Sequence, residues 1–227
     1  MLTIPSPVVR KWLRRLLPIL VIPAAVLVGS TILDGRHSLL LSFGVAALSL
    51  LLFLAGFEKK PEGSRRMVIT SVLTALSVVG RVIPFFKPVT AITVISGVWR
   101  GREAGFLVGS LSALLSNFLF GQGPWTPFQM LAWGLIGWMA GLLSRFLKKR
   151  RWILLYGVAS GIGYSLVMDV WSVLWYSGSL NGSLYLTAVM TALPHTLLYA
   201  VSNFIFLWFL ETPCGEKLAR IKTKYGI

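Results

Sequence analysis

The sequence predicts an all-α integral membrane protein, and three observations support this prediction. Of the 227 residues, 56% are hydrophobic and 13% are charged, and the mean hydropathy is +0.76. A soluble domain of this composition would expose more apolar surface than it tolerates. The apolar runs are about 20 residues long, as a membrane-spanning helix requires, and they lack the alternating pattern of barrel strands.

Hydropathy predicts eight spans along the chain. They cover residues 16–33, 39–57, 67–85, 89–99, 105–120, 128–147, 152–175 and 186–210. The first span follows basic residues, as a signal peptide does, but no A-x-A site ends it and a second span comes next. We therefore expect it to be a helix of the mature protein. The fourth is short, because Lys87 and Pro88 precede it and Arg100 follows it, and we expect it to tilt or to begin irregularly.

A polar stretch at residues 58–66 separates the first two spans from the other six. The first two spans contain no ionisable residue, which favours a role in packing or anchoring. We therefore expect residues 1–66 to form a two-helix N-terminal membrane extension with a cytoplasmic linker. Residues 67–227 should form a six-helix core with a basic cytoplasmic tail.

The basic residues alternate from loop to loop, as the positive-inside rule requires. With the N-terminus in the cytoplasm, 19 of the 22 Lys and Arg fall on inner segments, and only Arg36, Arg81 and Lys87 fall on outer ones. The predicted outer loops at 121–127 and 176–185 carry no charge. The pattern predicts an even number of spans with both termini inside. It also explains the net charge of +15 without nucleic acid as a partner.

Sequence motifs for catalysis and metal binding are missing. The chain has no phosphate-binding G-x-x-x-x-G-K-[ST] loop, H-E-x-x-H, C-x-x-C or G-x-S-x-G. The two histidines, His37 and His195, are too few for a dedicated metal site, and Cys214 has no second cysteine to pair with. We expect no intrinsic cofactor and no ATP hydrolysis by this chain.

Small residues recur at four-residue spacing on several predicted helices, which allows close contact between helix backbones in a membrane. The strips are Gly101-Gly105-Gly109-Ala113, Gly137-Gly141, Gly157-Gly161 and Ser71-Ala75. For most strips we expect packing within the protein. We predict that Ser71 and Ala75 face a partner protein, with the 101–113 strip as the second candidate.

Polar and aromatic residues gather around the loop 121–127, Gly-Gln-Gly-Pro-Trp-Thr-Pro, where apolar helices meet the predicted outer surface. Such a mixture is typical of small-molecule sites. The predicted ligand-binding residues are Phe86, Lys87, Asn117, Gln122, Trp125, Gln129, Trp133, Asp169, Trp175 and Tyr176, with His195 as a deeper wall. Three alternatives are an interfacial belt position for Trp125, an ion pair between Asp169 and Arg81, and an interior structural role for His195.

Three segments are similar to parts of the substrate-binding components of energy-coupling factor (ECF) transporters. They are I-P-F-F-K-P at 83–88, G-Q-G-P-W-T-P-F-Q-M at 121–130 and W-G-L-I-G-W-M-A-G at 133–141. The resemblance covers about residues 66–210. It implies a six-helix core in a prokaryotic plasma membrane that binds a vitamin near the outer surface. It also implies docking on a transmembrane scaffold, the T component, driven by two cytoplasmic ATPases.

In this family the first core helix usually presents an A-x-x-x-A strip to the scaffold, and Ser71-x-x-x-Ala75 is the counterpart here. The loop 121–130 and the many aromatic residues most resemble the cobalamin type, which implies cobalamin or a related corrinoid as the transported ligand. Alternatives are another vitamin or precursor, a small membrane-embedded enzyme with Asp169 and His195 as an acid/base pair, and an assembly factor without a ligand.

Overall fold

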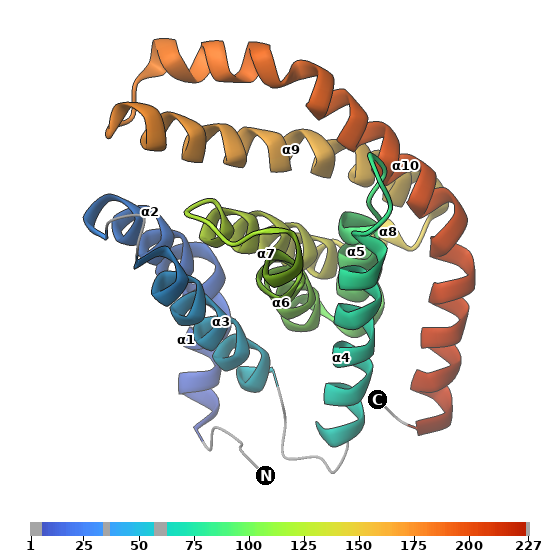
Figure 1. The fold of residues 1–227 in the computed structure, drawn as a ribbon. Helices are drawn as coiled ribbons and strands as arrows, with labels where there is room; N and C mark the ends of the chain where they lie inside the picture. Colours follow the sequence, from blue (N-terminus) through green and yellow to red (C-terminus); the bar gives the residue numbers. More distant parts are fainter. Residues whose placement is uncertain (1–5, 34–36, 57–62, 226–227) are drawn as a thin grey trace.

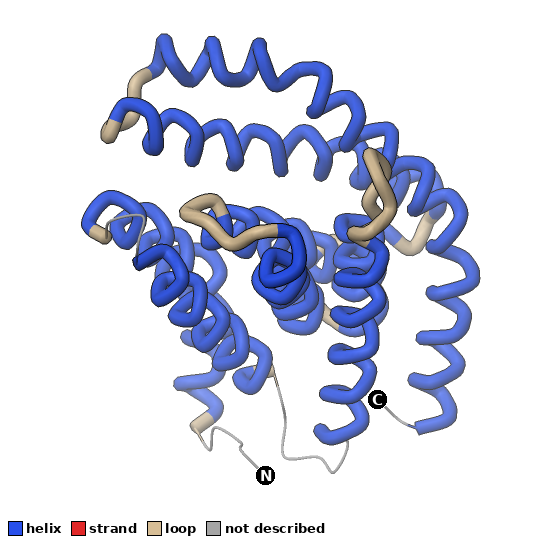
Figure 2. The backbone as a smooth tube through the Cα atoms, viewed as in Figure 1, coloured by secondary structure: helices blue, strands red, loops and turns tan. Residues whose placement is uncertain are grey.

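The computed structural model describes residues 6–33, 37–56 and 63–225. Within these ranges the chain folds into helices joined by short loops and contains no strand (Figures 1 and 2). The predicted all-helical class is therefore confirmed for this part of the chain. Arg36, Phe57, Lys59 and Lys60, together with most of the polar stretch at 58–66, lie outside the described residues.

The N-terminal segment forms α1 (Pro7–Leu16), a π-helical turn (Leu17–Val21), α2 (Ile22–Ile32) and α3 (Ser38–Ala55). The Ser6 hydroxyl caps α1 by accepting from the Val9 amide at 3.4 Å. Pro18 lies in the π-helical turn, where a missing backbone N–H interrupts the regular α-helical ladder. The segment does not stand apart, because α3 packs against both α6 and α7.

Four helices follow: α4 (Gly63–Gly80), α5 (Val89–Arg100), α6 (Arg102–Phe120) and α7 (Thr126–Leu142). The helix α4 ends at Gly80, before the predicted end of the third span at residue 85. Pro84 and Pro88 lack backbone N–H donors, and Phe85 adopts a left-handed conformation with φ of 61°, so residues 81–88 form a loop instead. The short helix α5 matches the predicted fourth span.

Glycines bring α5, α6 and α7 into backbone contact. A Cβ atom on Gly137 would collide with the backbone of Gly105, and one on Gly109 would collide with the backbone of Trp133. A Cβ atom on Gly161 of α9 would likewise meet the backbone of α10 at Ala200. These strips therefore pack within the protein. The 101–113 strip, our second candidate for a partner surface, is buried against α7 and is unsuitable for that role.

The C-terminal part consists of α8 (Ser144–Leu147), α9 (Arg150–Ser177) and α10 (Gly182–Tyr225). Figure 1 shows α9 and the first half of α10 as an antiparallel hairpin across the core, while the second half of α10 curves toward the end where α1 begins. The interior residues Pro194 and Pro213 interrupt the hydrogen-bond ladder of α10, which permits such curvature. This helix is much longer than the predicted span at 186–210.

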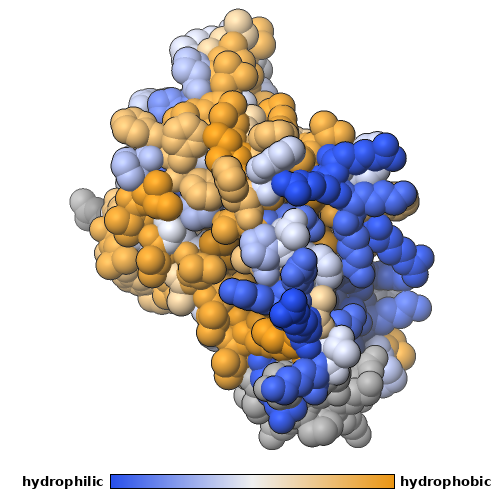
Figure 3. All heavy atoms as spheres, turned by 90° about the vertical axis from the view of Figure 1, so that its right-hand side faces the viewer, coloured by the Kyte–Doolittle hydropathy of each residue, from blue (hydrophilic) through white to orange (hydrophobic). Residues whose placement is uncertain are grey.

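Five helices of the described chain are long and apolar enough to cross a membrane, by length and composition. They cover Pro7–Ile32, Ser38–Ala55, Arg102–Phe120, Arg150–Ser177 and Gly182–Lys224. Helices α4, α5 and α7 lie at the other three predicted positions. Figure 3 shows hydrophilic side chains gathered along one edge of an otherwise largely hydrophobic face. The structure is that of a membrane protein, and the count of eight spans stays a prediction.

Candidate functional site

A buried polar cluster connects α4, α6, α7 and α9 at the end of the molecule that carries residues 121–127, which we call the outer end. The amide of Asn117 donates to Thr126 Oγ1 at 2.8 Å and to Gln129 Oε1 at 2.9 Å. The amide of Gln129 donates in turn to the Tyr164 hydroxyl at 3.0 Å. Asn117 and Gln129, both predicted as ligand contacts, are thus brought together, but their amides bind neighbouring side chains.

Arg81 completes this cluster from the end of α4. Its Nη1 donates to Asn117 Oδ1 at 2.6 Å and also to the Ser116 hydroxyl. The guanidinium lies 5.5 Å from the centre of the Phe120 ring and 5.3 Å from that of Trp133, close enough for cation–π attraction. Arg81 therefore pairs with amide, hydroxyl and aromatic groups, and the ion pair with Asp169 considered above is not formed.

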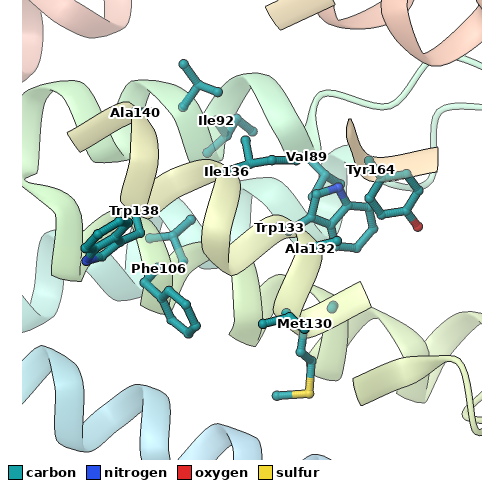
Figure 4. Packing of buried hydrophobic residues seen from close by; sticks show 14 of the residues in the cluster. Val89, Ile92, Phe106, Met130, Ala132, Trp133, Ile136, Trp138, Ala140 and Tyr164 are labelled. Atoms are coloured by element: carbon teal, nitrogen blue, oxygen red, sulfur yellow. The ribbon is translucent and has the colours of Figure 1, made fainter. Parts of the chain in front are cut away.

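Trp133 is part of the same packed region and is only 2% exposed. Its ring stacks on Tyr164 with centroids 5.0 Å apart, and Tyr164 contacts Tyr199 of α10 at 5.1 Å. Figure 4 shows the Trp133 and Tyr164 rings side by side among buried aliphatic residues. This aromatic stack joins α7 to α9 and α10, and it leaves little of Trp133 free to touch a ligand.

Hydrogen bonds of Gln122 fix the loop 121–127 to α6 and to the start of α7. Gln122 donates through Nε2 to the Leu114 carbonyl at 3.0 Å and accepts through Oε1 from the Thr126 hydroxyl at 3.0 Å. Thr126 is fully buried at the start of α7. The sequence did not predict the roles of Thr126, Ser116 and Tyr164. The spacing of residues along the chain does not show which hydroxyl groups form hydrogen bonds between different helices.

A row of tryptophans runs from this loop to the hairpin. The rings of Trp125 and Trp171 pack edge to face with their centroids 5.9 Å apart, and the ring of Trp171 stacks on that of Trp175 with centroids 6.3 Å apart. Trp171 and Trp175 line a narrow crevice of about 90 Å³, together with residues of α2, α3 and the loop 121–127. Trp125 and Trp175, both predicted site residues, thus belong to one aromatic surface, and Trp175 is 53% exposed.

A groove at the outer end lies between α9 and α10. Its volume is about 400 Å³, and its lining includes Asp169, Ser172, Tyr176, Thr187 and Thr191. Asp169 is only 7% exposed, and its Oδ2 atom is buried without a hydrogen-bond partner within the described part of the chain. A buried acceptor of this kind is costly unless a donor reaches it. The lining of the groove therefore includes a carboxylate with one oxygen that no donor of the described residues reaches.

The remaining predicted residues lie elsewhere. Phe86 and Lys87 are half-buried in the loop 81–88, which is tied to α10 because the Lys87 amide donates to the Ser202 hydroxyl at 3.0 Å. Burial lowers the pKa of the Lys87 ammonium, and the nearby charge of Arg81 lowers it further. His195 is exposed on α10 and is not among the residues that line the groove. The predicted residues thus occupy several neighbouring places, not one cup.

Together these features define a class of protein: a helical membrane protein with a substrate-sized groove at one end and no nucleotide-binding motif. The model of the family described as "ECF transporter, substrate-specific component" matches residues 65–214, and the chain belongs to this family. It is a substrate-binding subunit of a transporter and not a catalytic enzyme. This finding excludes the acid/base enzyme considered above. Helices α1, α2 and α3 lie outside the matched residues.

Two curated proteins are similar to this chain, and both are named "UPF0397 protein". One, from Clostridium perfringens strain SM101, is 28% identical over 136 residues, which cover 56% of this chain and 68% of the relative. The other, from strain ATCC 13124 of the same species, is 26% identical over 136 residues with the same coverage. No solved structure matches the chain.

Proposed function

We propose that this subunit captures a vitamin or vitamin precursor from outside the cell in the groove between α9 and α10. The observation that carries this proposal is Asp169, which lines a groove of about 400 Å³ and has a carboxyl oxygen without a hydrogen-bond partner among the described residues. That volume is within the range of about 300–1,000 Å³ for small-molecule sites. Because the family binds substrates, a buried acceptor in a groove of this size is the strongest candidate for a ligand contact.

Cobalamin or a related corrinoid is the first ligand to test. Its amide side chains offer N–H donors to Asp169, and the exposed Trp175, at the end of the row that Trp125 and Trp171 begin, offers an apolar ring for contact with a large ligand. The groove volume instead favours a smaller vitamin or precursor, since a corrinoid is too large to be enclosed there. A corrinoid would therefore bind in this groove only if α9 and α10 move apart at their outer ends.

A binding assay on the purified full-length chain in detergent tests this proposal. We expect one member of a panel of water-soluble vitamins and their precursors, cobalamin included, to bind saturably at one site per chain. If the ligand is a small vitamin enclosed in the groove, the larger vitamins of the panel should not displace it. If no member of the panel binds, the proposal of a vitamin-capturing subunit is wrong.

We further propose that the chain transports nothing alone and depends on a T component and two cytoplasmic ATPases. The lack of a phosphate-binding loop supports this dependence. The proposed docking surface is the face of α4 that carries Ser71 and Ala75. Both residues are exposed, as are Val68, Val72 and Leu76 beside them, so a partner helix can approach this face closely.

Substitution of Ala75 by Trp should therefore separate uptake from binding. We expect vitamin uptake to fall about tenfold or more in cells that also express the T component and the ATPases, because about 1.4 kcal/mol of lost docking energy has this effect. The affinity of the purified variant should equal that of the wild type. The matched control is Ala47→Trp, at an exposed alanine of α3. Normal uptake by cells with Ala75→Trp would exclude the face of α4 as the docking surface.

The proposed location is a prokaryotic plasma membrane, crossed eight times with both termini in the cytoplasm. The division of basic residues between inner and outer segments supports this topology. Single cysteines placed in residues 121–127 should react with an impermeant reagent in intact cells, and cysteines in residues 148–151 should not. The reverse pattern would contradict the orientation.

A further inference from the structure

The helix α1 has a basic side and an apolar side. Arg10 and Arg14, like Lys11 and Arg15, are four residues apart and thus lie on one side of the helix. On the other side Val8, Trp12 and Leu16 are 61%, 58% and 39% exposed. A helix of this kind is typical of a segment that lies in the interface between a membrane and water.

Ionic contacts fix the basic side of α1 to the core. Glu103, at the start of α6, is 2% exposed, and its Oε1 atom accepts from Arg14 Nε and, at 3.0 Å, from Arg102 Nε. Nearby, Arg66 donates to the Gly56 carbonyl at 3.2 Å and to the Arg100 carbonyl at 3.3 Å. These contacts hold α1 and the end of α3 beside the starts of α4 and α6.

A cavity of about 240 Å³ lies between α1, the end of α3 and the start of α6. Five basic side chains line it, those of Arg10, Lys11, Arg14, Arg15 and Arg102. The described lining includes no carboxylate, and Glu103 beside it pairs with Arg14 and Arg102, so the lining itself is positively charged. Its volume exceeds that of several water molecules, each about 30 Å³ in the liquid, and is ample for a phosphate group.

We propose that this cavity binds a phosphate group, and that its source is the headgroup of an anionic membrane lipid. The cavity lies among segments that the charge pattern assigns to the inner membrane surface, where anionic headgroups attract clustered Lys and Arg. The exposed apolar side of α1 next to it offers a surface for acyl chains. The N-terminal helices, which lie outside the family match, would then provide a lipid site that is independent of the vitamin site.

Lipid binding by the purified full-length chain tests this proposal. In native mass spectrometry from neutral-detergent micelles, phosphatidylglycerol should bind more tightly than phosphatidylcholine. The double variant Lys11→Gln/Arg15→Gln should weaken phosphatidylglycerol binding about 30-fold, at about 1 kcal/mol per basic residue. Both side chains are exposed, and neither forms the ion pairs with Glu103, so the variant should keep the fold and the thermal midpoint of the wild type.

The matched control is Lys217→Gln/Lys222→Gln, which removes the same charge from exposed positions of α10. We expect it to bind phosphatidylglycerol as the wild type does. An equal loss in both double variants, or no loss in either, would overturn the proposal. A separate arm adds inorganic phosphate: displacement of the lipid together with a raised thermal midpoint would support the phosphate site with free phosphate as its source.

Discussion

The α5–α6–α7 unit and the α9–α10 hairpin differ in how completely they bury their residues. Eleven of the twelve residues of α5 are buried, and the polar side chains of Asn117 and Gln129 at the outer end of the unit bind one another. Along the hairpin, by contrast, Leu186 and Met190 are 64% and 59% exposed, and the Asp169 carboxyl has a buried oxygen without a partner in the described chain. The first region is a packed scaffold, whereas the second leaves room for a ligand.

This difference has a physical cause. Between helices in lipid the hydrophobic drive is weak, so close backbone packing and satisfied hydrogen bonds supply most of the association energy. The three-helix unit has close backbone packing at its glycines and side-chain hydrogen bonds in its amide cluster. The outer half of the hairpin has fewer such contacts and should open at a lower free energy than the unit. Separation of the outer ends of α9 and α10 is therefore the expected route by which a ligand enters the groove.

The largest effect is expected from a bulky residue at the centre of the unit. Gly137→Leu places side-chain atoms where the backbone of Gly105 and the side chain of Thr93 lie. We expect a loss of about 3 kcal/mol or more in unfolding free energy, seen as little folded protein in size-exclusion chromatography. The control Gly44→Leu, at an α3 glycine with open space around it, should give a normal yield. A normal yield for Gly137→Leu would show that the unit is not tightly packed.

A smaller effect should distinguish the unit from the hairpin. Asn117→Ala removes bonds to Arg81, Thr126 and Gln129 inside the cluster and should lower the unfolding free energy by about 2 kcal/mol. Asn181→Ala removes an exposed cap, in which Asn181 Oδ1 accepts from the amides of Ser183 and Leu184, and should cost about 1 kcal/mol. Denaturant unfolding in mixed micelles measures both values. Equal losses of unfolding free energy in the two variants would contradict the difference in packing between the three-helix unit and the hairpin.

The sequence predicted the helices better than the site. Long apolar runs marked the spans, and four-residue glycine spacing marked the contacts within the unit, because both depend on local periodicity. The ends of α4 and α10 were less predictable. The helix α4 stops at Gly80, inside the apolar run and before Pro84, whereas α10 continues beyond its apolar run to Tyr225. Asn117 and Gln129 were predicted to contact the ligand, yet in the structure they bind each other.

That outcome has a general reason. A polar residue at membrane depth is satisfied either by a ligand or by another side chain, and sequence spacing does not tell which tertiary partner is within reach. Asp169 and Gln129 look alike in the sequence, as polar residues on apolar helices. Only the structure separates Gln129, which binds Tyr164, from Asp169, which lines a groove and whose Oδ2 has no hydrogen-bond partner in the described part of the chain.

The most direct measurement is the affinity of purified Asp169→Asn for the vitamin that the wild type binds, with Glu216→Gln as the control at an exposed carboxylate of α10. A hydrogen bond to a charged group contributes about 1.5–3 kcal/mol. We therefore expect Asp169→Asn to bind at least about tenfold more weakly, with an unchanged thermal midpoint, and Glu216→Gln to bind as the wild type does. Wild-type affinity in Asp169→Asn would contradict a ligand site in the groove between α9 and α10.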